Sequence, residues 1–128
     1  MALNILVVDD SAVMRAIIIR VLGLAGLPVQ SVHQAGNGQE ALEVLSREWI
    51  DLALIDINMP VMDGIELISR IRQMPETAAL PVVVVSTEST TTRISMLEQQ
   101  GVRFVHKPFS PESLRLTVTE MTGVGSEQ

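Results

Sequence analysis

The sequence predicts a single α/β domain in which helices cover both faces of a parallel sheet. Short apolar segments alternate five times with segments whose apolar residues recur at helical spacing, and this alternation is typical of right-handed βαβ units. The strongest apolar segments are continuous, as expected for strands buried on both faces. A chain of 128 residues that is 47% apolar has the size and composition of one domain, which can fill its core without a metal or a disulfide.

In the N-terminal half, strands are expected at residues 5–8, 29–34 and 51–55. The segment 29–34 is the least apolar, so it is expected at an edge of the sheet. A helix is expected from Ser11 to about Ala25, where an apolar stripe runs until Gly26 and Pro28, residues that end helices. Asn37-Gly38 is interpreted as a turn, followed by an amphipathic helix over residues 39–47.

In the C-terminal half, four consecutive valines predict a strand at residues 82–85, and a further strand is expected at 102–105. A helix is expected from about Ile65 to Met74-Pro75. A second, at residues 90–100, is weak because it begins with three threonines. A last helix begins with Ser110 as its cap and Pro111 in its first turn, and it reaches about Met121. We therefore expect one domain over residues 1–121 and a flexible tail over 122–128.

Composition excludes several classes of function. The chain has no cysteine, so disulfides, thiolate metal sites and thiol catalysis are excluded. Its net charge is −6 and its nine basic residues are scattered, which argues against a nucleic-acid partner because phosphate binding needs a clustered basic face. The N-terminus has no basic leader, and Arg15 and Arg20 interrupt the longest apolar region. We expect a cytoplasmic protein without membrane insertion.

Polar residues follow four of the predicted strands. Asp9 and Asp10 follow the first, Asp56 the third and Ser86 the fourth, and Lys107 comes shortly after the fifth. Because the carboxyl ends of parallel strands meet at one edge of a sheet, we expect these side chains to converge there.

Three ionised carboxylates about 5 Å apart repel by roughly 3 kcal/mol per pair at an effective dielectric constant of 20. Such a cluster requires protonation, a cationic neighbour or a bound metal. One lysine is not enough to balance it. Oxygen ligands favour a hard ion, and Mg²⁺ suits a site that also receives phosphate.

Four motifs in order resemble the receiver domain of two-component response regulators. They are Val-Val-Asp-Asp-Ser at residues 7–11, Asp-Ile-Asn-Met-Pro-Val-Met-Asp-Gly at 56–64, Val-Val-Ser-Thr-Glu at 84–88 and Lys-Pro-Phe at 107–109. The resemblance runs from about Leu3 to Met121, and the chain length is similar to that of single-domain chemotaxis receivers of the CheY type. It implies a flavodoxin-like fold with five helices around a five-stranded sheet of order 2-1-3-4-5.

The resemblance also implies a role for each residue of the site. Asp56 is similar to the acceptor of a phosphoryl group from a sensor histidine kinase. Asp10 and Asp56 resemble direct Mg²⁺ ligands, Asp9 a residue that acts through a water on the metal, and Asn58 a residue that gives its backbone carbonyl. Lys107 resembles the lysine that pairs with the phosphoryl oxygens.

The implied switch uses the Ser86 hydroxyl, which would turn inward to the phosphoryl group, and Phe104, which stands at the family's aromatic switch position. A phenylalanine has no hydroxyl, so we expect only the steric part of that coupling. The downstream target would bind the face made by the fourth helix, fifth strand and fifth helix. We expect a monomer or a weak dimer, with no turnover of an independent substrate.

Three further positions concern the lifetime of the phosphoryl group. Asn58 and Glu88 would flank the path of the hydrolytic water, from which we expect a short-lived phosphorylated state. Thr87 replaces the small residue common in the family, and we expect its bulk to slow the entry of phosphodonors. The resemblance also implies a cis bond between Lys107 and Pro108.

Three other interpretations stay open. A flavodoxin-like cofactor binder would need a phosphate-binding loop after the first strand, where Asp9 and Asp10 would repel a phosphate. A metal-dependent phosphohydrolase with an aspartyl nucleophile would need an acid where this chain has Asn58. A receiver that acts by dimerising without phosphorylation is the third.

Overall fold

The computed structural model describes residues 2–57, 62, 64–86, 91–107 and 109–123, without the side chains at 91–93 and 96. Five strands and five helices alternate within these residues: β1 (Leu3–Val8), α1 (Ala12–Leu24), β2 (Val29–Ala35), α2 (Gly38–Arg47), β3 (Leu52–Ile55), α3 (Gly64–Gln73), β4 (Val82–Ser86), α4 (Thr91–Glu98), β5 (Arg103–His106) and α5 (Pro111–Thr122). Every predicted element is present, and its ends differ from the prediction by at most about two residues, which is the usual uncertainty of helix and strand boundaries.

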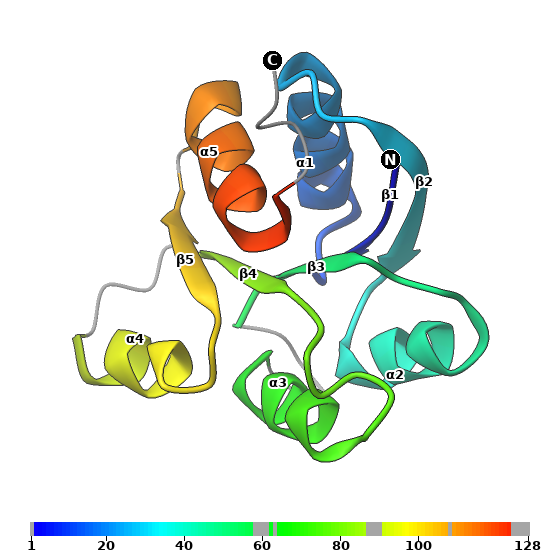
Figure 1. Cartoon of the computed structure of the whole chain (residues 1–128), viewed down its shortest axis with the longest axis vertical. Coiled ribbons are helices and arrows are strands. Elements are labelled where there is room, and N and C mark those ends of the chain that lie inside the picture. The colour runs from blue at the N-terminus through cyan, green and yellow to red at the C-terminus, as the bar shows by residue number, and fades with distance from the viewer. Residues whose placement is uncertain (1, 58–61, 63, 87–90, 108, 124–128) are drawn as a thin grey trace.

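The five strands form one parallel sheet in the order β2-β1-β3-β4-β5 (Figure 1). The predicted α/β fold class and strand order are therefore confirmed. Strands β3 and β4 are buried at every residue, whereas β2 and β5 carry exposed residues. This difference follows from position, because β2 and β5 are the edges of the sheet.

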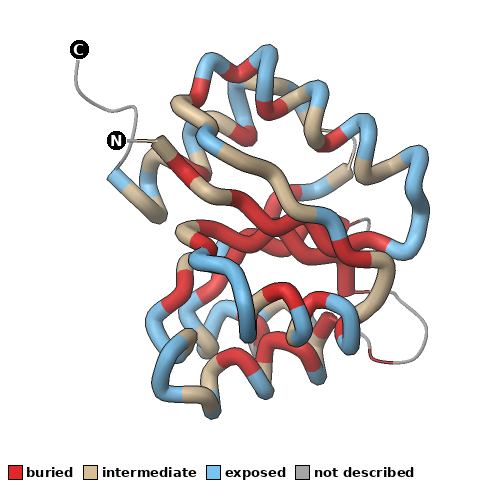
Figure 2. Tube along the Cα trace, turned by 90° about the vertical axis from the view of Figure 1, so that its right-hand side faces the viewer, coloured by how far each residue is buried: buried red, intermediate tan, exposed pale blue. Residues whose placement is uncertain are grey.

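Helices α1 and α5 cover one face of the sheet, and α2, α3 and α4 cover the other (Figure 1). Successive strand residues point to opposite faces, so each strand feeds two cores. Val83 and Val85 of β4 pack in the core under α1 and α5, and Val82 and Val84 pack in the core over α2, α3 and α4. Figure 2 shows the central strands as a buried band between the two helical layers. Among the described helices, none has both the length and the apolar character that crossing a bilayer requires.

Side-chain caps fix the starts of three helices. The Ser11 side chain accepts a hydrogen bond from the Met14 N–H, and the Asn37 side chain accepts one from the Glu40 N–H. At α5, Ser110 and Ser113 bond to each other's backbone N–H in a capping box, so the predicted cap at Ser110 is confirmed. Each cap satisfies amide groups that the first helical turn cannot pair.

The turn expected at Asn37-Gly38 is wrong, because Asn37 is the cap of α2 and Gly38 is its first residue. A Cβ atom at Gly38 would lie 2.8 Å from the Met62 Cγ and Sδ atoms. Glycine at position 38 therefore allows close packing against Met62 and does not form a turn.

Arg72, near the end of α3, joins three separate segments through backbone carbonyls. Its Nε donates to the Gln100 carbonyl at 2.8 Å, and its Nη1 donates to the carbonyls of Leu80 at 2.7 Å and Ala78 at 3.2 Å. Burial lowers the pKa of the Arg72 guanidinium, and the carbonyls take the place of the water that it loses. Arg72 thus ties α3 to the segment before β4 and to the residues that follow α4.

Gly64, the first residue of α3, passes unusually close to the end of β3. Its N–H donates to the Ile57 carbonyl at 3.1 Å. A Cβ atom there would lie 2.6 Å from the Asp56 carbonyl oxygen and 2.5 Å from the Ile57 Cα. These are backbone atoms at the end of a buried strand, so they cannot move aside without shifting Asp56.

We expect Gly64→Ala to lower the free energy of unfolding by about 1–3 kcal/mol, because inserted atoms in a packed region force the backbone to shift. Urea denaturation followed by circular dichroism measures this change. Gly23→Ala is the matched control, since no atom lies within 4 Å of its Cβ position and alanine favours a helix over glycine by up to about 1 kcal/mol. Equal stability of Gly64→Ala and the unsubstituted chain would contradict the close approach.

Candidate functional site

The polar residues of the candidate site continue the hydrogen-bonding of the sheet past the strand ends. The Asp9 N–H donates to the Ala35 carbonyl at 3.1 Å, and the Asp56 N–H donates to the Val8 carbonyl at 2.9 Å. The Lys107 N–H donates to the Ser86 carbonyl at 3.0 Å. The backbone of each residue is therefore fixed by its neighbouring strand, and the side chains leave from one edge of the sheet.

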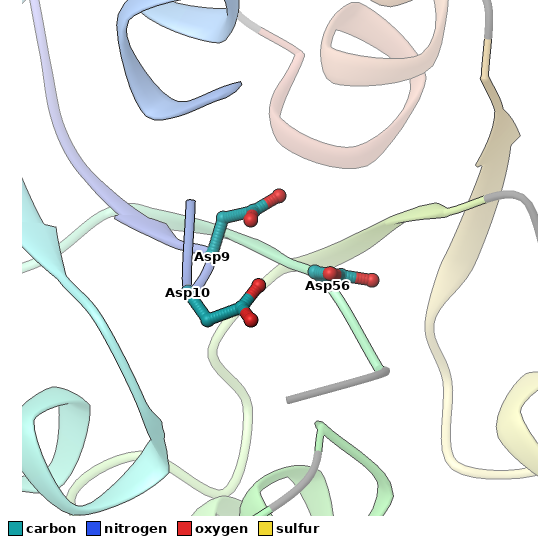
Figure 3. A group of neighbouring side chains, drawn as sticks. All are labelled: Asp9, Asp10 and Asp56. Atoms are coloured by element: carbon teal, nitrogen blue, oxygen red, sulfur yellow. The ribbon is translucent and has the colours of Figure 1, made fainter. Parts of the chain in front are cut away.

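Three carboxylates meet at this edge. Asp9, Asp10 and Asp56 each offer an oxygen, and these oxygens all lie within 4.8 Å of one another. Figure 3 shows Asp9 and Asp10 leaving the end of β1 beside Asp56 at the end of β3. Asp9 is 1% exposed and Asp56 is 8% exposed, whereas Asp10 lies in solvent. The group thus has two sheltered acids and one open side.

Both carboxylate oxygens of Asp9 have partners. Its Oδ1 accepts from the Ser11 N–H at 2.9 Å, and its Oδ2 lies 3.3 Å from the Lys107 Nζ. The lysine side chain is 16% exposed and the Asp9 side chain 2%, so solvent screens this ion pair less than a surface pair. Lys107 is remote in sequence from Asp9, yet it brings a positive charge to the acidic group.

Arg15 also supports the site, although the sequence suggested only that it interrupts an apolar region. Its Nη1 donates to the Asp9 carbonyl at 2.6 Å, and its Nε donates to Gln34 Oε1 at 2.9 Å. The arginine therefore joins the segment that carries Asp9 to strand β2. Its place in the first turns of α1, next to the acidic pair, is the only sequence signal that points to this contact.

Ser86 and Phe104 lie on the two strands at the other side of Asp56. Ser86 ends β4 and is 1% exposed. Phe104 is half-buried on β5, pairs with Val84 and packs against the core on the side of α2, α3 and α4. Its ring meets the His106 ring edge-on, with 4.7 Å between the ring centroids. Asn58, Thr87, Glu88 and Pro108 lie outside the described residues, so their roles stay predictions.

The donor set fits a hard divalent cation. All three clustered groups are carboxylates, and Mg²⁺ is usually held by one or two carboxylates together with phosphate oxygens and water. Asp10, on the open side, leaves room for the remaining ligands. The acidic group can therefore hold a metal ion.

Comparison with known proteins identifies the family. The model of the response regulator receiver domain matches residues 5–119. The chain belongs to this family. A chemotaxis protein CheY homolog of Campylobacter jejuni is 33% identical over 126 residues, which cover 97% of this chain and 95% of the relative. The resemblance inferred from the four motifs is thereby confirmed, and the receiver domain is a module of two-component signalling.

Solved structures and longer relatives agree with this assignment. The chemotaxis response regulator CheY4 of Vibrio cholerae has a TM-score of 0.82 and 30% identity, and the match covers 94% of this chain and 99% of that one. A protein-glutamate methylesterase/protein-glutamine glutaminase of Syntrophomonas wolfei is 41% identical over 114 residues, which cover 87% of this chain and 31% of the relative. The match to that enzyme thus spans only about a third of it.

We expect Asp10→Asn to stabilise the receiver domain when no divalent cation is present, because it removes one of three repelling charges. The gain should be about 1 kcal/mol, since Asp10 lies in solvent that screens it, or roughly 3–5 °C in melting temperature. Thermal unfolding in the presence of a chelator measures this change.

Added Mg²⁺ should raise the melting temperature of the unsubstituted domain by mass action and should have less effect on Asp10→Asn. Glu43→Gln, an exposed change on α2 that removes the same charge, serves as the control. It should melt like the unsubstituted domain in chelator and respond to Mg²⁺ as that domain does. An Asp10→Asn variant that melts lower than the unsubstituted domain in chelator would refute the repulsion.

Proposed function

We propose that this receiver domain accepts a phosphoryl group on Asp56 from a sensor histidine kinase in a Mg²⁺-dependent reaction, and that the phosphorylated form binds a downstream target in the cytoplasm. The observation that carries this proposal is the meeting of Asp9, Asp10 and Asp56 within 4.8 Å. It is supported by the amino group of Lys107, which lies against Asp9, and by membership of the receiver family.

Asp56 is the nucleophile in this proposal because it lies at the end of a central strand with its backbone fixed by Val8. A carboxylate oxygen of Asp56 attacks the phosphorus of a phosphohistidine in line. The new P–O bond forms as the P–N bond breaks, and the imidazole leaves with the electron pair. Phosphoryl transfer needs little covalent help from a protein, so a fixed nucleophile and matched charge supply most of the catalysis.

Charge balance decides which side chains take part. A bound Mg²⁺, held by Asp10 and Asp56, with Asp9 acting through water and the Asn58 carbonyl as a further ligand, would neutralise charge on the transferring group. The Lys107 ammonium, 3.3 Å from Asp9 in this structure, would contact the phosphoryl oxygens as charge builds up on Asp56. Lysine suits this change of partner, because its ammonium is a point charge on a flexible stem.

The switch would follow from the new acceptor oxygens on Asp56. Ser86 ends β4, and its hydroxyl would donate to the phosphoryl group and draw the following segment with it. Phe104 would then pack further inward. Converting a population from mostly inactive to mostly active takes about 5.5 kcal/mol, and a hydrogen bond to a charged group supplies about 1.5–3 kcal/mol. Ser86, Lys107 and the metal site would therefore share this free-energy difference.

The target would bind the face formed by α4, β5 and α5. On this face Arg103 of β5 and Glu120 of α5 form an ion pair at 3.2 Å, with both side chains about half exposed. An exposed pair of this kind contributes little to stability, so it can open without cost to the fold. Displacement of Phe104 on the same strand would change this surface.

Intact-mass measurement after incubation with acetyl phosphate and Mg²⁺ tests the phosphoryl transfer. We expect a mass increase of one phosphoryl group that a chelator suppresses and Asp56→Asn abolishes. The adduct should decay within hours, because Asn58 and Glu88 are expected to leave a path for the hydrolytic water.

Asp51→Asn is a matched control, because Asp51 precedes the same strand at its other end and contacts Asn4 and Trp49. It should be phosphorylated at the normal rate. Unchanged phosphorylation of Asp56→Asn, or turnover of small phosphoesters by the unsubstituted domain, would count against the proposal.

Lys107→Ala separates phosphorylation from switching. We expect the variant to accept the phosphoryl group but to show less than about half of the amide chemical-shift change in α4 and β5, because the ammonium no longer reaches the phosphoryl oxygens. Nuclear magnetic resonance spectra of both proteins, recorded with and without acetyl phosphate and Mg²⁺, provide the measurement. Shift changes as large as those of the unsubstituted domain would argue against a part for Lys107 in the switch.

A further inference from the structure

A groove runs along the outer side of α2 and α3 and ends at the edge of the sheet opposite Asp56. It consists of three hollows of about 580, 220 and 320 Å³. The first and second share Leu42 and Met74, and the second and third share Leu45 and Thr77. Shared walls make the hollows one continuous surface. The 580 Å³ hollow lies between α2 and α3. The 320 Å³ hollow lies at the N-terminal ends of β3 and β4, where Asp51 and Pro81 line it.

An exposed tryptophan stands at the end of this groove in a fixed position. Trp49 is 76% exposed, and its indole N–H donates to Asp51 Oδ1 at 2.8 Å. The other oxygen of Asp51 accepts from the Asn4 N–H at 2.8 Å and from the Asn4 side chain at 3.3 Å. The indole is therefore tied through Asp51 to Asn4 of β1, while much of its surface remains open. A pre-oriented aromatic surface loses little entropy on binding, and tryptophan is enriched among the residues that dominate interfaces.

The 320 Å³ hollow of the groove has acidic walls. Glu48, Asp51 and Glu76 surround the 320 Å³ hollow, with no lysine or arginine among the described residues that line it. In the 580 Å³ hollow, Glu66 is already paired with Arg70 at 2.9 Å. His33 lies 3.9 Å from Glu48 and adds positive charge only when protonated. An apolar floor with a negative rim is complementary to a surface that carries both apolar and basic side chains.

We propose that this groove binds a basic amphipathic segment of a partner protein. An apolar side chain of the segment fills the 320 Å³ hollow beside Trp49, and lysine or arginine side chains lie near Glu48 and Glu76. A cation over the open face of the indole adds an attraction of the kind seen between ammonium or guanidinium groups and aromatic rings. Leu42, Leu45 and Met74 continue the apolar contact along α2 and α3.

This surface is separate from the phosphorylation proposed for Asp56. The 320 Å³ hollow is lined mainly by residues that precede β3 and β4, whereas Asp56 and Ser86 lie at the opposite ends of the same strands. We therefore expect binding in the unphosphorylated protein and equal binding in Asp56→Asn. Failure of the phosphorylation experiment would leave this expectation intact, and the two proposals can be refuted independently.

Trp49 reports directly on the groove, because it is the only tryptophan of the chain and there is no tyrosine. The probe is a synthetic amphipathic helix of leucine and lysine, titrated into the full chain while Trp49 fluorescence is recorded. We expect a saturable blue shift of the emission as the indole leaves water. A peptide of the same pattern with glutamate in place of lysine should not produce it.

Charge reversal in the groove provides the decisive comparison. Glu48→Lys/Glu76→Lys should bind the leucine–lysine peptide at least about tenfold more weakly, a difference of about 1.4 kcal/mol. Glu98→Lys/Glu112→Lys makes the same change in net charge at exposed positions on α4 and α5, and it should keep most of the affinity. Circular dichroism of both variants checks that the fold is retained.

Three results would overturn the proposal. They are an unchanged Trp49 emission with the leucine–lysine peptide, equal binding of the leucine–glutamate peptide, and equal weakening by the two charge reversals. Sedimentation velocity without peptide adds a fourth test. If the chain self-associates and its Trp49 emission shifts with protein concentration, a second copy occupies the groove and the basic partner segment is wrong.

Discussion

Mutual repulsion of carboxylates at one sheet edge is the constraint on which the rest of the structure depends. Asp9, Asp10 and Asp56 bring their oxygens within 4.8 Å of one another, and like charges at such distances repel one another. One ammonium group, from Lys107, offsets only part of this charge. In the proposed function, the remaining imbalance is what draws a cation to the site and, with that cation, a phosphoryl group.

A cluster of this kind needs a frame that cannot relax away from it. The strands that carry the acids, β1 and β3, lie side by side in the middle of the sheet, and both are buried by helices on two sides. Backbone hydrogen bonds extend beyond the strands to Asp9, Asp56 and Lys107. Gly64 brings α3 into contact with the Asp56 carbonyl. The sheet edge that carries these residues is thus rigid because the strands that lead to it are buried.

Much of the fold could be predicted because it depends on local patterns. Continuous valine, leucine and isoleucine runs predict the central strands, and the cap at Ser110 predicts the start of the last helix. The acids were predictable because they follow those strands directly. What could not be predicted depends on neighbours distant in sequence. Local sequence favours a turn at Gly38, because the residue that it packs against, Met62, is distant in the sequence.

The same limit applies to other parts of the molecule. Nothing local in the sequence shows that Arg15 bonds to the Asp9 carbonyl, or that Trp49 is held by Asp51 beside a groove. Each arrangement is completed by a distant segment: Arg15 also bonds to Gln34 of β2, and the segment before β4 lines the hollow beside Trp49. The residues that meet at the strand ends can be predicted from a sequence because parallel strands share a direction. The surface between two helices cannot, because it is defined only by their packing.

The bond from Arg72 to the Gln100 carbonyl has a mechanical consequence for α4. It fixes the chain just beyond the C-terminal end of that helix to α3. Any displacement of α4 that preserves this bond must be a rotation of the helix about its C-terminal end. The excursion would then grow with distance from Gln100 and be greatest at the helix start, the end that follows β4 and its terminal Ser86.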